Sequence, residues 1–513
     1  MNDKSIFRKV ALMCVSIPLA VSSHAANINI TDASITEDIS HPSDTVLFQP
    51  TQETGAMDYS ISPGVTIEAN YINFQRLGIR NPEDYSYTYV DINSVNIGSS
   101  SALKAANSIT IGYNLGPTTS TGALFDVGYA MYVNSSWNST DDTVNVVNGF
   151  YLQGGTHTID NFTLSESGGE DGQTTFSGVT ANISNSTLNM QGKLYVQSGA
   201  NVTIKDSQTK LESYELSQIK GGNLTIQGGK FTIINSYEYS PKPFTVGGGS
   251  FVIDGAEVDA RGVVLSTRTS PSTADAVITL KNGAVLTAGT MDLYTYDGLS
   301  NTAVFNIENG SVANVATLSP YGEVRGGTIN VNNGTLNLSA GIVQSEPNGS
   351  QIYTTKLNVT NGGKIDLNGT LDVASVVADD GTIIANSIVV GDGRTLSVTG
   401  SSVIDTELLS VYDGSTVSLD SNTILNIGSL EVILSDLEEG TTYNLSDIFG
   451  DDTSIVLSAV ENNITMSDMQ DHSFGAIVSG NGQITAVPEP ATYAAIFGAF
   501  ALAFAFAAYR RRK

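Results

Sequence analysis

The stretch Leu280-Lys281-Asn282-Gly283-Ala284-Val285 shows the pattern that decides the fold. An apolar residue precedes one variable residue, then a polar residue or glycine, then Gly, and a second apolar residue follows two or three places on. The pattern recurs at Val196–Val202, Ile226–Phe231, Val252–Gly255, Ile307–Val312, Val331–Leu336, Val359–Gly363 and Val411–Gly414. Its glycines at 199, 229, 255, 283, 310, 334 and 363 are separated by 30, 26, 28, 27, 24 and 29 residues. Such a period is typical of the coils of a repeat protein.

This repeat predicts an all-β protein, an elongated right-handed parallel β-helix. The short strands of one coil cannot bury their inward Val, Ile and Leu side chains alone, so stacked coils must share one core. Asn-Gly and Asp-Gly supply the corners, because Gly, Asn and Asp tolerate positive φ. The same dipeptides also form hairpin turns, so a sandwich of antiparallel hairpins is the alternative. The spacing favours the β-solenoid, since a hairpin needs fewer residues.

Composition supports a β-rich chain and excludes several classes of function. Charged residues make up 14% of the 513 residues, and there are 51 glycines, whereas helical surfaces normally carry many charges. Between residues 26 and 487, Lys and Arg fall from 23 to 16 and Asp and Glu from 51 to 49, so the formal charge is 16 − 49 = −33. Such an acidic body repels phosphate backbones, and we expect no nucleic-acid partner.

The N-terminus has the three parts of a secretory signal peptide. Lys4, Arg8 and Lys9 precede an apolar run from Val10 to Val21, and small residues follow at Ala25 and Ala26, where signal peptidase would cut. The run spans only about 18 Å as a helix, too short for a bilayer core of about 30 Å. The only cysteine, Cys14, lies in this segment. We therefore expect residues 1–25 to be removed after passage through the secretion translocon, leaving no thiol chemistry.

The C-terminus predicts a membrane helix. Residues 491–509 form an uncharged, Ala- and Phe-rich stretch that would reach about 28 Å as a helix. Arg510, Arg511, Arg512 and Lys513 follow, and by the positive-inside rule they stay in the cytoplasm. The body would then face outward. Pro488, Glu489 and Pro490 stand immediately before the helix, where the two prolines favour an extended backbone that a processing enzyme can reach.

The order Pro-Glu-Pro, hydrophobic helix and arginine-rich end resembles the PEP-CTERM sorting signal, over residues 488–513. The resemblance implies that an exosortase, a membrane-embedded cysteine peptidase, recognises Pro488, Glu489 and Pro490 while the helix and Arg510 to Arg512 hold them at the membrane. It also implies an inner-membrane precursor in a Gram-negative bacterium that produces exopolysaccharide. The final location would be the cell surface, the outer membrane or the extracellular matrix. The body resembles autotransporter passenger domains in texture only.

The body divides into three regions by regularity. Residues 26–175 form an irregular β-rich region or cap, broken by five prolines. Residues 176–430 carry the solenoid repeats, and residues 431–487 form a C-terminal cap or a short β module. Capping is expected because the open end of a solenoid must be covered.

The residues offer little evidence of chemistry. His41, His157 and His472 are far apart, without metal-ligand spacing, so we expect no metal site and no cofactor. Acidic turns at Asp379-Asp380, Asp392, Asp413 and Asp451-Asp452 leave calcium binding open, although turns of this kind are more often structural. Tyr237, Tyr239, Tyr294 and Tyr296 could stack on sugars or simply face solvent from a strand.

These observations favour a non-enzymatic adhesin or an exopolysaccharide-associated structural protein that contacts surface glycans. The alternative is a β-helical polysaccharide lyase or glycoside hydrolase, since such sites assemble across coils. The scarcity of basic residues disfavours a lyase. Three or more carboxylates converging in a groove with an aromatic rim would favour an enzyme, and a smooth Thr, Asn and Ser face would count against it. We predict no catalytic residue.

Overall fold

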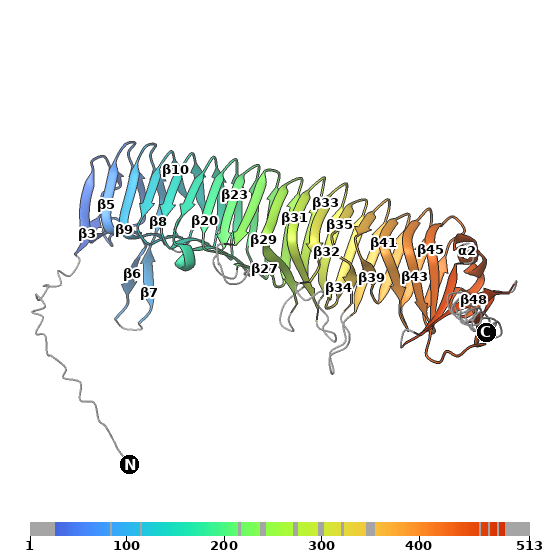
Figure 1. Cartoon of the computed structure of the whole chain (residues 1–513). Coiled ribbons are helices and arrows are strands. Elements are labelled where there is room, and N and C mark those ends of the chain that lie inside the picture. The colour runs from blue at the N-terminus through green and yellow to red at the C-terminus, as the bar shows by residue number, and fades with distance from the viewer. Residues whose placement is uncertain are drawn as a thin grey trace, which may run out of the picture.

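The computed structural model describes residues 26–82, 85–112, 115–213, 217–235, 243–269, 275–295, 302–319, 323–344, 354–460, 463–469, 472–479 and 482–487. They form a parallel β-solenoid of about 16 turns, drawn in Figure 1 as a long rod of stacked coils. Neighbouring strands lie about 4.8 Å apart, so this stack is roughly 75 to 80 Å long. The prediction of an all-β parallel β-solenoid is confirmed, and the antiparallel sandwich is wrong, because successive coils pair in parallel.

One strand of each coil belongs to a sheet that we call the flat sheet. Its neighbours, in order, are β2 (Ser34–Ile35), β4 (Met57–Ile61), β8 (Ile92–Ile97), β10 (Thr118–Thr121), β13 (Trp137–Thr140), β16 (Thr156–Asp160), β19 (Thr180–Ser184), β22 (Asn201–Lys205), β25 (Gly222–Gln227), β28 (Gly249–Asp254), β30 (Ala276–Lys281), β32 (Ala303–Glu308), β34 (Gly327–Asn332), β37 (Thr355–Thr360), β40 (Ser375–Asp379), β42 (Thr395–Thr399) and β44 (Thr416–Leu419).

The rest of each coil belongs to a second sheet, the bent sheet, which folds along a line parallel to the rod. Some coils cross this bend in one long strand and others in two short strands, as in β38 (Lys364–Leu367) and β39 (Thr370–Asp372). The long ones are β3 (Ile39–Phe48), β5 (Thr66–Phe74), β9 (Ala102–Ile111), β29 (Glu257–Arg268), β31 (Val285–Tyr294), β41 (Thr382–Val390), β43 (Val403–Tyr412) and β45 (Ile424–Leu434). Where β29 pairs with β31, the register shifts between Ala260 and Val264, at the bend.

The corner between the flat sheet and the bent sheet has one left-handed residue in successive coils. These positions are Gly122, Asp141, Asn161, Asn185, Asp206, Gly228, Gly255, Asn282, Asn309, Asn333, Asn361, Asp380 and Gly400, all with φ between 48° and 64°. Gly lacks the Cβ that penalises this conformation, and short Asn and Asp side chains tolerate it. The expected role of Asn-Gly and Asp-Gly at corners is confirmed.

The glycine spacing mixes two different corners. One group of glycines follows flat-sheet strands by one to three residues, so the spacing within that group gives the coil lengths to within one residue: Gly229, Gly255, Gly283, Gly310, Gly334 and Gly363. Gly199 precedes β22 and Gly414 precedes β44, so these two glycines stand at the corner where flat-sheet strands begin. The step from Gly199 to Gly229 is therefore not a coil length. Some earlier coils are shorter. The corner residues Asp141 and Asn161, which bond each other across adjacent coils, are only 20 residues apart in sequence.

The same parallel ladder crosses residue 175, where the sequence suggested a boundary. Strand β15 (Gly149–Gln153) pairs with β18 (Gln173–Ser177), and β18 pairs with β21 (Lys193–Gln197). The described N-terminal region also carries an antiparallel hairpin of β6 (Leu77–Arg80) and β7 (Tyr87–Val90), which projects from the rod in Figure 1.

Helices and antiparallel strands cover the last coil. Helix α1 (Ser446–Phe449) contacts β44, and α2 (Thr453–Ala459) contacts β45. Strand β47 (Ile464–Asp468) continues the ladder from β45, and β48 (Ser473–Val478), β49 (Gln483–Val487) and β46 (Thr442–Asn444) then pair antiparallel. Two short 3-10 turns lie at η1 (Gly169–Asp171) and η2 (Gly450–Asp452). Ile448, Phe449 and Val456 are buried, which shields the end of the apolar core from water.

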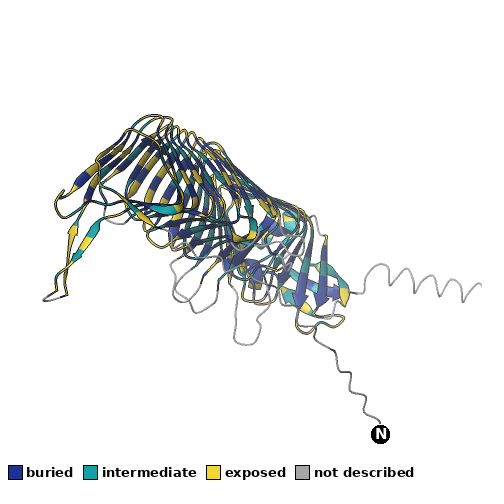
Figure 2. Cartoon of the chain, turned by 90° about the vertical axis from the view of Figure 1, so that its left-hand side faces the viewer, coloured by how far each residue is buried: buried dark blue, intermediate teal, exposed yellow. Residues whose placement is uncertain are grey.

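One continuous apolar core fills the rod, and Figure 2 shows buried residues recurring along the strands of the stacked coils. The sole tryptophan, Trp137, stands in it with its ring 5.7 Å from Phe125 and 5.8 Å from Phe162. Its indole N–H donates to Ser120 at 2.8 Å, and Asp142 accepts from the Ser139 hydroxyl at 2.6 Å and the Ala123 amide at 2.7 Å. These polar groups are hydrogen-bonded, as buried groups must be.

Two titratable side chains point into the core and were not anticipated. Glu166, on β17 (Thr163–Glu166), lies between Val146 and Met190 in adjacent coils and is 2% exposed. Burial raises its pKa to about 7, although the Gly168 amide donates to it at 2.7 Å. His157 is fully buried beside Trp137, and burial lowers its pKa. Both are core residues of the solenoid.

Replacing the corner residue Asn333 tests the corner assignment. Its φ is 50° and its side chain is exposed. Asn333→Ala should lower the free energy of unfolding by about 1 kcal/mol because a Cβ disfavours this conformation, whereas Asn333→Gly should leave it nearly unchanged. Denaturant titration measures both. Equal losses for the two variants would contradict the left-handed corner.

Glu166→Gln tests the buried carboxyl. From about pH 4.5 to about pH 7 the unfolded chain releases the Glu166 proton while the folded chain keeps it, so rising pH destabilises the fold. The difference amounts to about 3 kcal/mol above pH 7. The variant lacks this penalty. Its unfolding free energy relative to wild type should therefore rise between pH 4.5 and pH 7 and then level off, and a pH-independent difference would contradict the prediction.

Candidate ligand-binding groove

A groove follows the bend of the bent sheet along the second half of the rod. One hollow of about 620 Å³ crosses the coils of β29, β31, β33 (Val312–Thr317), β35 (Thr335–Leu338) and β38. A second hollow of about 840 Å³ crosses β41, β43 and β45 and ends against α2. Strand pairing joins the two, because Asp366 of the first hollow stands opposite Ile384 of the second.

The floor of the groove contains a column of outward residues, one from each coil. In order they are Thr287, Asn314, Asn337, Asp366, Ile384, Asp405 and Asn426. Six steps of about 4.8 Å make this column roughly 29 Å long. Strand alternation explains it: residues one position away, such as Ala313 and Leu336, point into the core. Except at Ile384, the column repeats hydrogen-bonding groups at the spacing of the coils.

Asn side chains recur along the groove, three in the lining of each hollow. The Asn337 amide donates to Asn314 Oδ1 at 2.8 Å, and the Asn386 amide donates to Asn368 Oδ1 at 3.4 Å. Because an amide has two donors and a carbonyl oxygen accepts twice, each side chain keeps groups for a ligand after bonding its neighbour. Such a surface suits hydroxyl-rich molecules. None of the described residues lining the two hollows is aromatic.

Three carboxylates reach the groove. One lies on β38, and the other two lie on β43. Asp366 is 45% exposed, with Lys364 Nζ at 3.0 Å. Asp405 and Glu407 stand two residues apart on β43, both exposed in the second hollow. They are the pair that general acid and base chemistry would need. The aromatic rim expected for an enzyme is missing from the described lining.

The flat sheet presents a different surface, a face of Asn, Thr and Ser side chains. There the Asn330 amide donates to Asn306 Oδ1 at 2.8 Å, and the Asn358 amide donates to Asn330 Oδ1 at 2.7 Å. The outward neighbours before these are Thr203, Thr225, Val252 and Thr279. This face also repeats coil by coil. None of the described pockets lies on this face.

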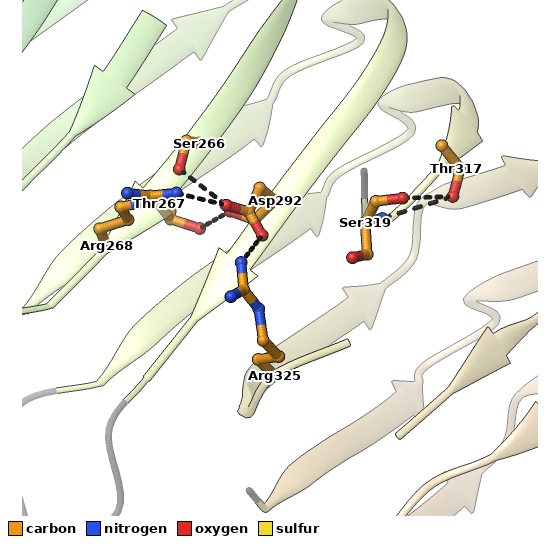
Figure 3. Close-up of polar contacts among 7 residues, drawn as sticks. All are labelled: Ser266, Thr267, Arg268, Asp292, Thr317, Ser319 and Arg325. Carbon is orange, nitrogen blue, oxygen red and sulfur yellow. Dashed lines mark hydrogen bonds and ion pairs between the residues drawn. The ribbon is translucent and has the colours of Figure 1, made fainter. Parts of the chain in front are cut away.

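A charged cluster lies at the far end of the bent sheet, shown in Figure 3. Asp292 on β31 is 1% exposed and has Arg268 at 3.3 Å and Arg325 at 3.4 Å. The Ser266 hydroxyl also donates to it at 3.4 Å, and Arg325 lies 4.4 Å from the Tyr294 ring centre. One buried carboxylate thus positions two guanidinium groups, which the sequence did not reveal because the three residues are far apart in the chain.

The sorting residues predicted from the sequence lie outside the described part of the chain: Ala25, Pro488, Glu489, Pro490, Arg510, Arg511 and Arg512. The predicted helix 491–509 and the signal peptide also lie outside it. Within the described residues no helix is long and apolar enough to cross a bilayer. Ala26 is described and exposed, and its amide donates to Asp44 Oδ1 at 3.0 Å.

The other candidates are scattered. Tyr237, Tyr239 and Tyr296 fall outside the description, whereas Tyr294 contacts Arg325. His41 lies 3.7 Å from Asp44, and His472 bonds Asp468 at 2.7 Å, at opposite ends of the rod.

The acidic turns serve mainly as structural acceptors. Asp380 accepts from the Ser401 amide at 2.7 Å, Asp379 from Thr399 at 3.0 Å, and Asp413 from the Tyr443 hydroxyl at 2.8 Å. Over the described ranges, no group of three His, Cys, Asp or Glu side chains is placed to hold a metal ion.

Comparison with known proteins identifies no relative. No protein-family model matches the chain, no curated protein is similar to it, and no solved structure matches its fold. The functional assignment therefore depends on the geometry of the molecule itself.

Proposed function

We propose that this chain is an exported surface or extracellular-matrix protein that binds a hydroxyl-rich glycan along its groove without cleaving it. The carrying observation is the column across the bend of seven coils, in which six of the seven residues are Asn, Asp or Thr and the other is Ile384. Its length of roughly 29 Å suits an extended polymer better than a single small molecule. The amides supply both donors and acceptors, which a polyhydroxyl chain needs on every unit.

The proposal includes the processing predicted from the sequence. A right-handed solenoid would leave the cytoplasm through the translocon, lose residues 1–25, and stay anchored by residues 491–509 until an exosortase acts near Pro488, Glu489 and Pro490. The support is the order of sequence features at the two ends. In this role the rod is an adhesin or a structural partner of exopolysaccharide.

A glycoside hydrolase is the second candidate, because Asp405 and Glu407 share one exposed stretch of β43 within the groove. Release of reducing ends from a bound polysaccharide, abolished by both Asp405→Asn and Glu407→Gln, would support it. Binding without release supports the structural role.

Removing groove amides should weaken glycan binding. We expect the double variant Asn314→Ala, Asn337→Ala to bind exopolysaccharide of the producing bacterium about 30-fold more weakly, because two hydrogen bonds of about 1 kcal/mol are lost. The control is Asn306→Ala, Asn330→Ala on the flat sheet, which breaks an equivalent amide pair. Surface plasmon resonance with the immobilised polysaccharide measures both. Equal losses would contradict the groove, and undetectable binding of the wild type would contradict the function.

Processing is tested by intact mass in the native host. The mature chain should begin at Ala26, and the region after Pro490 should be lost only when the exosortase gene is present. Glu489→Ala should leave the tail uncut. A tail that persists in both strains would indicate that the C-terminus is a simple membrane anchor.

A further inference from the structure

The first hollow of the groove begins at an arginine whose guanidinium is held in place. Arg261 lines this hollow at the bend of β29, and its side chain is 70% exposed. Its Nε donates to Asp259 Oδ1 at 2.9 Å, and its Nη2 donates to Asp259 Oδ2 at 2.6 Å. Such a bidentate pair fixes the orientation of the planar fork as well as its position.

The strand register places this guanidinium at the end of the groove floor. Asp259 stands directly before Thr287, the first residue of the outward column, in the neighbouring coil. The two residues are about 4.8 Å apart along the rod. A guanidinium that is bound to Asp259 therefore lies beside the column, and its exposure leaves it open to a ligand that follows the groove.

Most of the donors of Arg261 remain available to such a ligand. A guanidinium has five N–H donors, and within the described part of the chain two of them bond Asp259. Three remain. Because the fork is planar, neighbouring N–H groups can bond two oxygens that are held side by side. Two adjacent hydroxyl groups of a sugar provide this arrangement, and so does a carboxylate.

The charges along the groove distinguish these two ligands. Hydrogen bonds from Arg261 lower the pKa of Asp259, so this carboxylate is ionised at neutral pH and offsets the guanidinium charge. Lys364 and Asp366 form a second pair at 3.0 Å, four coil steps or roughly 19 Å further along the same column. The second hollow contains the two carboxylates of β43, and its described lining has no Lys or Arg. The groove is thus neutral in its first part and acidic in its second, which disfavours a negatively charged ligand.

We infer that Arg261 selects a neutral sugar for the first hollow by bonding two adjacent hydroxyl groups, while Asp259 orients the guanidinium and rejects acidic sugars. The inference rests on the proposed glycan-binding function. Hydroxyl oxygens accept the three remaining N–H groups without adding charge. A ligand carboxylate at the same place would contact Arg261 but would also be repelled by the Asp259 carboxylate. Arg261 therefore contacts the ligand, and Asp259 is a positioning residue.

Two chemical forms of one polymer test this selection. Carboxyl reduction makes every unit of the exopolysaccharide of the producing bacterium neutral, and oxidation of its primary hydroxyls converts units to uronates. In surface plasmon resonance the wild type should bind the neutral form about tenfold or more tightly than the oxidised form. Arg261→Gln should weaken binding of the neutral form about tenfold, because hydrogen bonds to ligand hydroxyls are lost. Arg261→Lys should weaken it similarly, since Lys keeps the charge but lacks the fork.

Asp259→Asn gives a readout that a purely structural ion pair would not change. The variant leaves the Arg261 charge without its partner, so the affinity for the oxidised form relative to the neutral form should rise about tenfold. Its melting temperature should stay close to that of the wild type, because exposed ion pairs contribute little to stability. The control is Lys210→Gln, which breaks a similar pair with Glu212 two coils earlier, outside the hollow, and should change neither affinity.

The outcomes separate this inference from the proposed function. Binding that is weakened in the variant Asn314→Ala, Asn337→Ala but unchanged in both Arg261 variants overturns the role of Arg261 and leaves the groove in place. Full affinity in Arg261→Lys overturns the contact with two hydroxyls. Equal binding of the two polymer forms by the wild type overturns the selection. A wild type that binds neither form overturns the proposed function and this inference together.

Discussion

The core, the groove and the flat face of this protein depend on the parallel, in-register pairing of each coil with the next. Backbone hydrogen bonds between coils satisfy the polar groups of strands, and the same register stacks Val on Ile on Leu inside the rod. Since alternate residues face opposite sides of a strand, the register that builds the core also aligns the outer residues into columns. The groove and the Asn, Thr and Ser face are consequences of this alignment.

The pattern of apolar residues around Gly predicted the solenoid because it reflects local physics. Asn333 stands at a corner since its backbone must adopt positive φ, and this requirement is legible in the sequence. Which corner a glycine occupies is not legible, because Gly199 and Gly229 sit in similar local sequence but at opposite ends of a flat-sheet strand. The sequence period predicts the architecture. Which corner of the coil each glycine occupies can be assigned only when the pairing with the neighbouring coils is known.

The candidate sites were beyond prediction for a different reason. Asn314, Asn337 and Asp366 come from three separate coils and become neighbours only through the register. Likewise, Arg325 reaches Asp292 from 33 residues away. Glu166 was missed because a carboxylate that follows Thr, Leu and Ser in the sequence is typical of a surface residue. In the structure, strand alternation points its side chain inward. Features that depend on one local segment could be predicted from the sequence. Sites formed by side chains from several coils could not.

The bend gives the rod a property that length alone does not provide. Because each coil contributes one residue to the groove column, a coil could be added or removed as a unit, changing the rod by about 4.8 Å while the remaining contacts stay in register. The length of the groove column is therefore set by how many coils the gene encodes. The length of such a rod therefore evolves in discrete steps of one coil.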